Sequence, residues 1–135
     1  AGAQWASYLA ARGPREERHA TLPNIQGFLL LSGIYDLSGI PDSFLRDEAQ
    51  MTADEAAAWS PLTSSHFPAL RIIAYGDDET APFKEQASEF HRLLSSDVGG
   101  ASLISAPGLN HMSVVLDLAN PDGFLGRHLY DLVAA

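Results

Sequence analysis

The most constraining stretch of the sequence is a strand-like segment that leads through three consecutive acids into a helix-like segment. Residues 69–75 (ALRIIAY) are apolar and partly β-branched, as in a strand buried on both faces of a parallel sheet. The helical pattern begins near Pro82, a residue tolerated in a first helical turn. Asp77, Asp78 and Glu79 lie between the two. Because ligands and catalytic groups gather at the carboxyl ends of parallel strands, we expect at least one of these acids to take part in chemistry.

A second stretch has the same form, with a histidine in place of the acids. Residues 101–106 (ASLISA) are predicted to form a short strand, residues 107–111 (PGLNH) a turn, and residues 112–118 the start of a helix. His111 is therefore predicted at the carboxyl end of a strand as well. An acid loop followed by a histidine loop is the chain order of the last two members of the Ser-Asp/Glu-His triad in an α/β-hydrolase.

The first twelve residues have a helical pattern without a capping residue before it. Trp5, Tyr8 and Leu9 form the predicted apolar face, whereas Ser, Thr, Asp or Asn would be expected at an ordinary helix start. One interpretation is a frayed terminus. The other is that Ala1 and Gly2 occupy the two positions after the serine of a G-x-S-x-G nucleophile elbow, which opens a helix. That serine would be the residue immediately before Ala1.

A strand and a loop are predicted after a polar surface connection. Residues 25–32 (IQGFLLLS) have the pattern of a buried strand, and residues 33–37 (GIYDL) follow it as a loop. Tyr35 either lines a pocket or only shapes this loop. Asp36 is expected to form an Asx turn.

The remaining segments carry clear helix signals. Thr52 and Glu55 form a capping box before an alanine-rich helix, and Ser60-Pro61 ends that helix. Ser60 is not a persuasive nucleophile because no elbow sequence surrounds it. Residues 120–134 are predicted to form a C-terminal helix. Its predicted packing face consists of Phe124, Leu125, Leu129 and Leu132.

Composition narrows the class of function. A chain of 135 residues fits one small domain, and its formal net charge of -9 argues against binding of nucleic-acid phosphates. The sequence has no cysteine, which excludes disulfides and thiolate chemistry, and no apolar run approaches the ~20 residues that span a bilayer. We therefore expect neither nucleic acid nor membrane as a partner. The absence of cysteine does not determine the compartment, and a cytoplasmic location is the expectation.

The three acids also raise the alternative of a Ca²⁺ or Mg²⁺ site, since hard cations take oxygen ligands. No further carboxylates cluster near them in the sequence. His19, His66 and His91 show no metal-ligand spacing. We therefore expect no metal and no organic cofactor.

Several motifs resemble, in their order along the chain, those of the arylformamidases, the kynurenine formamidase branch of the α/β-hydrolases. They are Ala1-Gly-Ala3, Leu31–Leu37, Ser60-Pro61, Tyr75–Gln86 and Gly108–Met112. The most specific part is a glycine, an acid three positions on, a phenylalanine four further and a glutamine three beyond that. This part resembles the acid loop of the family and favours Glu79 over Asp77 and Asp78. The separation of 32 residues between Glu79 and His111 is also similar to that of the family.

The chain departs from the family pattern at two positions. The family acid is commonly Asp, and the corresponding residue here is Glu79, which other triads tolerate. The residue after the histidine is often Phe, and here it is Met112, which is expected to change the pocket wall.

The resemblance implies an α/β-hydrolase fold with a mostly parallel sheet flanked by helices. Residues 1–135 would be the C-terminal part of a single domain, and the N-terminal half with the nucleophilic serine would lie outside this chain. Three parallel strands alone would leave a long apolar edge unpaired, so we expect that the chain does not fold without that half. The missing half and a small-molecule substrate are thus expected partners, and a homodimer fits the family.

The resemblance also implies roles for individual residues in the hydrolysis of an aryl formamide such as N-formylkynurenine. His111 would be the general base, Glu79 would hold the imidazole, and the backbone N–H of Ala1 would be an oxyanion-hole donor. Tyr35 and Met112 would contact the substrate. Two alternatives remain open: a general carboxylesterase acting on short acyl esters, and a catalytically inactive hydrolase-fold binding protein.

Overall fold

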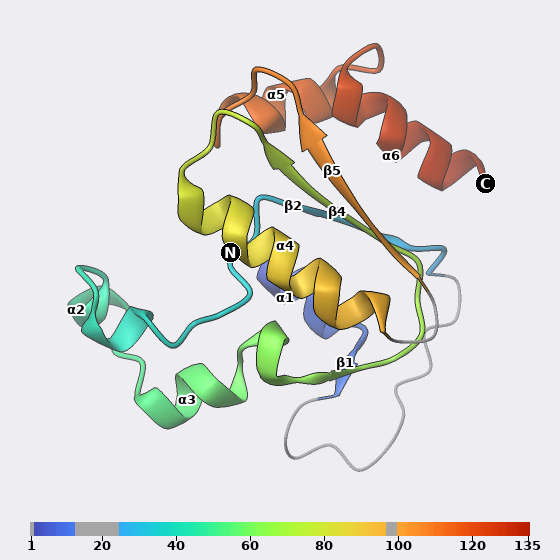
Figure 1. The fold of residues 1–135 in the computed structure, drawn as a ribbon. Coiled ribbons are helices and arrows are strands. Elements are labelled where there is room, and N and C mark those ends of the chain that lie inside the picture. Colours follow the sequence, from blue (N-terminus) through green and yellow to red (C-terminus); the bar gives the residue numbers. More distant parts are fainter. Residues whose placement is uncertain (1, 13–24, 97–99) are drawn as a thin grey trace.

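A sheet of three parallel strands forms the centre of the computed structural model, which describes residues 2–12, 25–96 and 100–135 (Figure 1). The strands are β2 (Phe28–Leu31), β4 (Arg71–Gly76) and β5 (Ala101–Ala106), in the order β2-β4-β5. The register between β4 and β5 runs from Arg71 opposite Ala101 to Gly76 opposite Ala106. The predicted α/β class is confirmed, and the strands lie close to the predicted ranges.

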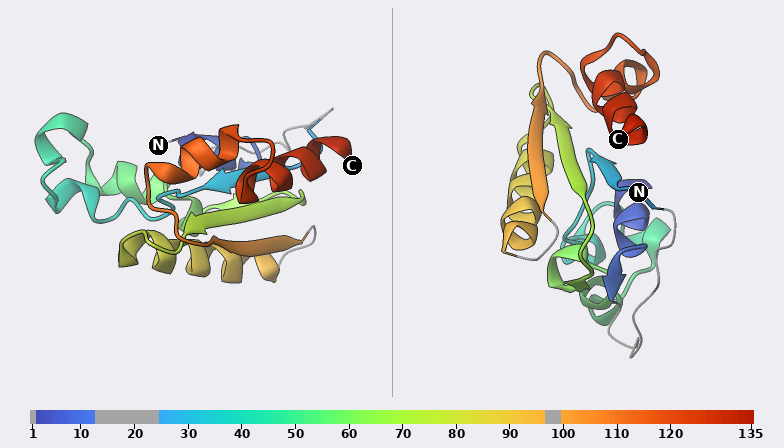
Figure 2. Two further views of the ribbon diagram at one scale, coloured as in Figure 1. Left: turned by 90° about the horizontal axis from the view of Figure 1, so that it is seen from above. Right: turned by 90° about the vertical axis from the view of Figure 1, so that its right-hand side faces the viewer.

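Helices cover both faces of this sheet. Figure 2 shows α4 (Ala81–Ser95) against one face, and α5 (Ser113–Ala119) and α6 (Phe124–Ala134) against the other. Each face has its own apolar core, because side chains alternate along each strand. Ile73 of β4 packs with α4, whereas the next residue, Ala74, packs with α5 and α6.

The helix that follows the acids begins as the sequence predicts. Thr80 precedes the first turn of α4, Pro82 lies within that turn, and the buried face consists of Ala87, Phe90 and Leu94. α6 begins later than predicted, at Phe124, because residues 120–123 form a turn after α5. Its packing face is also narrower than predicted. Leu125 and Leu132 are buried, whereas Phe124 and Leu129 each expose more than a third of their surface.

The prediction for the first helix is wrong about both its length and its buried face. α1 (Gly2–Tyr8) is followed by β1 (Ala11–Arg12), a short strand that pairs with β3 (Ser65–His66). Trp5 and Leu9 are 69% and 55% exposed. Small residues face the core at helical spacing instead, namely Ala3, Ala6, Ser7 and Ala10. Small side chains let the α1 segment pack closely against β2 and its neighbours.

Short helical elements connect β2 to β3. They are η1 (Ile40–Asp42), α2 (Arg46–Ala49), α3 (Ala53–Ala58) and η2 (Pro61–Thr63). The predicted capping box of α3 is confirmed, since the Thr52 hydroxyl accepts from the Glu55 N–H and the Glu55 carboxylate accepts from the Thr52 N–H. In the described part of the chain, no helix is long and apolar enough to cross a membrane.

Candidate active site

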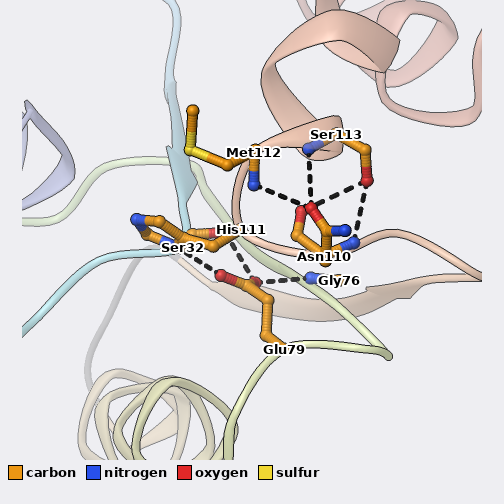
Figure 3. Close-up of polar contacts among 7 residues, drawn as sticks. All are labelled: Ser32, Gly76, Glu79, Asn110, His111, Met112 and Ser113. Carbon is orange, nitrogen blue, oxygen red and sulfur yellow. Dashed lines mark hydrogen bonds and ion pairs between the residues drawn. The ribbon is translucent and has the colours of Figure 1, made fainter.

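The two predicted site loops meet at the carboxyl edge of the sheet. Because β4 and β5 are adjacent and parallel, the acid loop after β4 lies beside the histidine loop after β5. Figure 3 shows the contact that results: Oε1 of Glu79 lies 2.6 Å from Nδ1 of His111. The carboxylate of Glu79 is fully buried, whereas the imidazole side chain is 52% exposed. The pair therefore has a fixed, inner acid and an accessible, outer histidine.

The second oxygen of Glu79 is also held by hydrogen bonds. Ser32 Oγ and the Gly76 N–H each donate to Oε2 over 2.7 Å (Figure 3). A buried carboxylate needs such donors in place of water, and bonds to an ionised acceptor are stronger than neutral ones. The acid is thus held by contributions from β2, β4 and the histidine loop.

Gly76 permits this arrangement because the histidine loop passes directly over it. A Cβ at this position would lie 2.0 Å from the backbone oxygen of Leu109. No side chain can occupy that space unless the loop moves. The same Leu109 oxygen accepts a hydrogen bond from the Asp78 N–H, which ties the acid loop to the histidine loop.

Asp77 and Asp78 have roles that differ from that of Glu79. The Asp77 carboxylate accepts from the Gly108 N–H, and its own N–H donates to the Ala106 oxygen. Asp78 contributes its backbone N–H and has an exposed side chain. Within the described residues, Glu79 is the acid of the three that contacts His111.

The histidine loop has its own internal hydrogen bonds. Asn110 Oδ1 accepts from the N–H groups of Met112 and Ser113, and Ser113 Oγ accepts from the Asn110 N–H. The first N–H groups of a helix have no acceptor within the helix, and these side-chain bonds supply acceptors for them at the start of α5. The turn thereby holds His111 directly before a helix.

Two further residues of the acid-loop motif also contact the site. The Phe83 ring stacks on the His111 imidazole with a centroid distance of 4.4 Å and an interplanar angle of 29°. Gln86 Oε1 accepts from the backbone N–H groups of Tyr35 and Asp36, at 2.6 and 2.9 Å. Phe83 thus supports the imidazole from α4, and Gln86 fixes the loop after β2.

Tyr35 does not line an open pocket in the described structure. Its side chain is fully buried and stacks on Phe90 with a centroid distance of 4.4 Å. Burial raises the pKa of the Tyr35 phenol, which therefore stays neutral. The interpretation that Tyr35 shapes the loop agrees with this packing, and the pocket interpretation does not. The Asx turn of Asp36 is confirmed, because its Oδ1 accepts from the Ser38 N–H.

The other predicted site residues lie at the edge of the described structure or outside it. Met112 is 76% exposed directly after His111, where a substrate could reach it. Ala1, the predicted oxyanion-hole donor, lies outside the described residues, as does His19. His66 and His91 bond to the backbone oxygens of Pro61 and Ala101.

Ser32 is a site residue that the sequence analysis missed. It belongs to the Leu31–Leu37 motif and directly follows β2, but nothing local indicates a contact with an acid 47 positions later. A polar residue at the carboxyl end of a buried strand was the available signal.

The geometry gives His111 a defined chemical capacity. With the Glu79 carboxylate at Nδ1, the neutral ring carries its proton on Nδ1 and leaves the Nε2 lone pair free. Within residues 2–12, 25–96 and 100–135, Nε2 has no hydrogen-bond partner. The described residues contain no cluster of three or more His, Asp or Glu side chains that could hold a metal ion. An accessible base with a buried acid behind it can take a proton from a nucleophile.

An apolar cavity of about 690 Å³ lies between α1 and the segment that connects β2 to α3. Its volume is in the range typical of small-molecule sites. Trp5 and Trp59 belong to its wall, together with Ile34 from the loop after β2. Glu48 and Glu55 also belong to this wall.

Two known proteins with similar sequences are kynurenine formamidases. The chain is 26% identical over 125 residues to the kynurenine formamidase of Salmo salar, covering 86% of this chain and 42% of that protein. It is 25% identical over 119 residues to the kynurenine formamidase of Danio rerio, covering 82% and 40% of the two chains. The chain thus spans about two fifths of the length of these curated relatives. No family model matches it.

A solved structure agrees with this assignment at the level of the fold. The crystal structure of a Silicibacter protein described as a putative thioesterase superposes with a TM-score of 0.76 and 22% sequence identity. The match covers 91% of this chain and 45% of that one. The predicted resemblance to the arylformamidases and the α/β fold class are therefore confirmed. The chain is arylformamidase-like: the two relatives with similar sequences are named kynurenine formamidases, and its α/β fold is shared with the solved structure.

Proposed function

We propose that this chain supplies the histidine and the acid of a Ser-His-Glu triad that hydrolyses an aryl formamide such as N-formylkynurenine. The observation that carries the proposal is the 2.6 Å contact between Glu79 and His111 at adjoining strand ends. The names of the two fish relatives support the substrate class. The proposed nucleophile is a serine immediately before Ala1.

The proposed reaction is acyl transfer in two steps. His111 Nε2 takes the serine proton as the oxygen attacks the formyl carbon, and then gives that proton to the departing arylamine nitrogen. In the second step, His111 Nε2 takes a proton from water as the water oxygen attacks the formyl-serine. The proton then passes to the serine oxygen as formate leaves. Glu79 keeps the imidazole in the required tautomer and stabilises its protonated form.

The backbone N–H of Ala1 is the proposed oxyanion-hole donor, since it belongs to the residue after the nucleophile. A donor of this kind typically lowers the barrier by about 3 kcal/mol. The second donor would come from outside this chain. We place Met112 at the substrate because it is exposed beside His111.

We propose the apolar cavity as the place of the aryl group. Two of its wall residues are close in sequence to groups of the proposed site: Trp5 lies five positions after the proposed nucleophile, and Ile34 lies two positions after Ser32. Its tryptophans offer flat apolar surfaces for an aromatic ring. A substrate bound there should change the fluorescence of Trp5 and Trp59.

The test uses protein that includes the residues before Ala1. Hydrolysis of N-formylkynurenine and of a p-nitrophenyl ester is measured for the wild type, Glu79→Ala and His111→Ala. Glu79→Ala should lower kcat by about 10⁴-fold, and His111→Ala, which removes the base itself, by about 10⁶-fold. Asp78→Ala is the matched control, because it removes a neighbouring carboxylate that does not contact His111. It should retain wild-type activity.

Three outcomes would overturn the proposal in different ways. A kcat/KM for the ester that equals that for N-formylkynurenine would favour a general carboxylesterase. Ligand binding without hydrolysis, together with a residue other than serine before Ala1, would favour an inactive binding protein. Hydrolysis that survives in His111→Ala would remove the triad. Peptide sequencing across Ala1 identifies the preceding residue before any kinetics.

A further inference from the structure

Ser32 adopts a backbone conformation that a serine rarely takes. Its φ is 49°, in the left-handed region, and Gln50 is the other described non-glycine residue with positive φ. The Ser32 N–H still donates to the Ala74 oxygen over 2.8 Å, which extends the pairing of β2 with β4 by one bond. Glycine would adopt this φ without strain, and strained residues of this kind cluster at functional sites.

This conformation directs the Ser32 hydroxyl into the acid loop of the neighbouring strand. Its Oγ lies 2.7 Å from Glu79 Oε2, and both residues are buried. The Gly76 N–H donates to the same oxygen, also over 2.7 Å. With Oε2 held from two sides, rotation of the carboxylate is restricted, and Oε1 points to Nδ1 of His111 (Figure 3).

We propose that Ser32 is a positioning residue of the active site, whose hydroxyl holds the Glu79 carboxylate in the orientation that fixes the tautomer of His111. The inference rests on the proposed function of the Glu79–His111 pair. Ser32 acts through Glu79 and does not touch His111. Hydrogen bonds to an ionised acceptor are among the stronger ones. Loss of the Ser32 hydroxyl should therefore measurably loosen the orientation of the Glu79 carboxylate.

Two substitutions at the same position separate the hydroxyl from the backbone conformation. Ser32→Ala removes the hydroxyl and keeps a Cβ at positive φ, whereas Ser32→Gly removes the hydroxyl and relieves the strain. If the hydroxyl positions Glu79, both variants lose about 10- to 100-fold in kcat with little change in KM. The glycine variant should nevertheless unfold at a higher temperature than the alanine variant. Activity and stability should therefore not follow the same order.

A second readout does not depend on catalysis. Long-range ¹H–¹⁵N NMR spectra show which nitrogen of the His111 ring carries the proton. The wild type should show the Nδ1–H tautomer, and both Ser32 variants should show a larger share of Nε2–H. Ser88→Ala is the control, because the Ser88 hydroxyl bonds to the Lys84 oxygen within α4. It should change neither kcat nor the tautomer.

The inference is overturned if Ser32→Ala keeps the wild-type kcat and tautomer, or if the loss of activity follows the unfolding temperature across the variants. A failure of the proposed function would give a different result, namely hydrolysis that is unaffected by His111→Ala. In that case the NMR comparison of the Ser32 variants would still show whether the Ser32 hydroxyl affects the tautomer of His111 through Glu79.

Discussion

Replacing Glu79 with glutamine should put the His111 proton on the wrong nitrogen. The amide is nearly the size of the carboxylate but has one acceptor oxygen and one donor nitrogen. The Gly76 N–H can only donate, so the amide oxygen must take the position of Oε2. The amide nitrogen then occupies the position of Oε1, 2.6 Å from Nδ1 in the wild type. Nδ1 must accept there, and the ring carries its proton on Nε2.

The alternative orientation of the amide accounts for part of the loss in kcat, and the loss of charge for the rest. Turning the amide over would leave the buried Gly76 N–H without an acceptor, which costs about 1–3 kcal/mol. Such a cost leaves roughly 1–20% of molecules with the productive orientation. The negative charge that stabilises the imidazolium is also lost. An acid-to-amide change in this role lowers kcat by about 10⁴-fold, which is the expected result here.

The assay combines kcat for N-formylkynurenine with the tautomer of His111 from ¹H–¹⁵N NMR. Asp78→Asn is the control, since it makes the same acid-to-amide change on the exposed neighbour. The reasoning is refuted if Glu79→Gln retains kcat within tenfold of the wild type, or if its ring keeps the Nδ1–H tautomer. A thermal unfolding curve shows whether both variants are folded.

Three further perturbations test the surrounding structure. Gly76→Ala should displace the histidine loop, because its Cβ would lie 2.0 Å from the Leu109 oxygen, and should lower kcat on the order of 100-fold while the protein stays folded. Gln86→Ala should lower the free energy of unfolding by about 2 kcal/mol, because two N–H groups after β2 lose their acceptor. Gln86→Glu keeps an acceptor and should leave this free energy nearly unchanged. Denaturant unfolding measures both variants. The bonds from Thr52 lower the pKa of Glu55, so this carboxylate stabilises α3 above its unfolded-state pKa and loses that effect as the pH falls through its lowered folded-state pKa. The difference in unfolding temperature between the wild type and Glu55→Gln should therefore shrink in acid, and a constant difference would contradict this.

Much of the local structure could be predicted because it depends on neighbouring residues. Strands, the capping box and the start of α4 are determined by apolar periodicity and by the side chains that bond to nearby backbone groups. The order of an acid loop and a histidine loop predicted that one of the three acids meets His111, because parallel neighbours bring their loops to one edge. The resemblance to the arylformamidases favoured Glu79 among the three. The structure places these two residues in contact. Their catalytic role stays a proposal, as does the need for a further half of the fold.

By itself, the sequence determined the α/β class, the positions of the strands and the loop that carries each member of the pair. Tertiary structure alone decided which distant groups complete the site. Ser32 reaches Glu79 from the neighbouring strand, Gln86 binds the loop after β2, and Tyr35 packs on Phe90 inside the core. It also decided that α1 buries its alanines and exposes Trp5. The physical reason is that burial and side-chain orientation depend on what lies opposite each residue, which local periodicity does not specify.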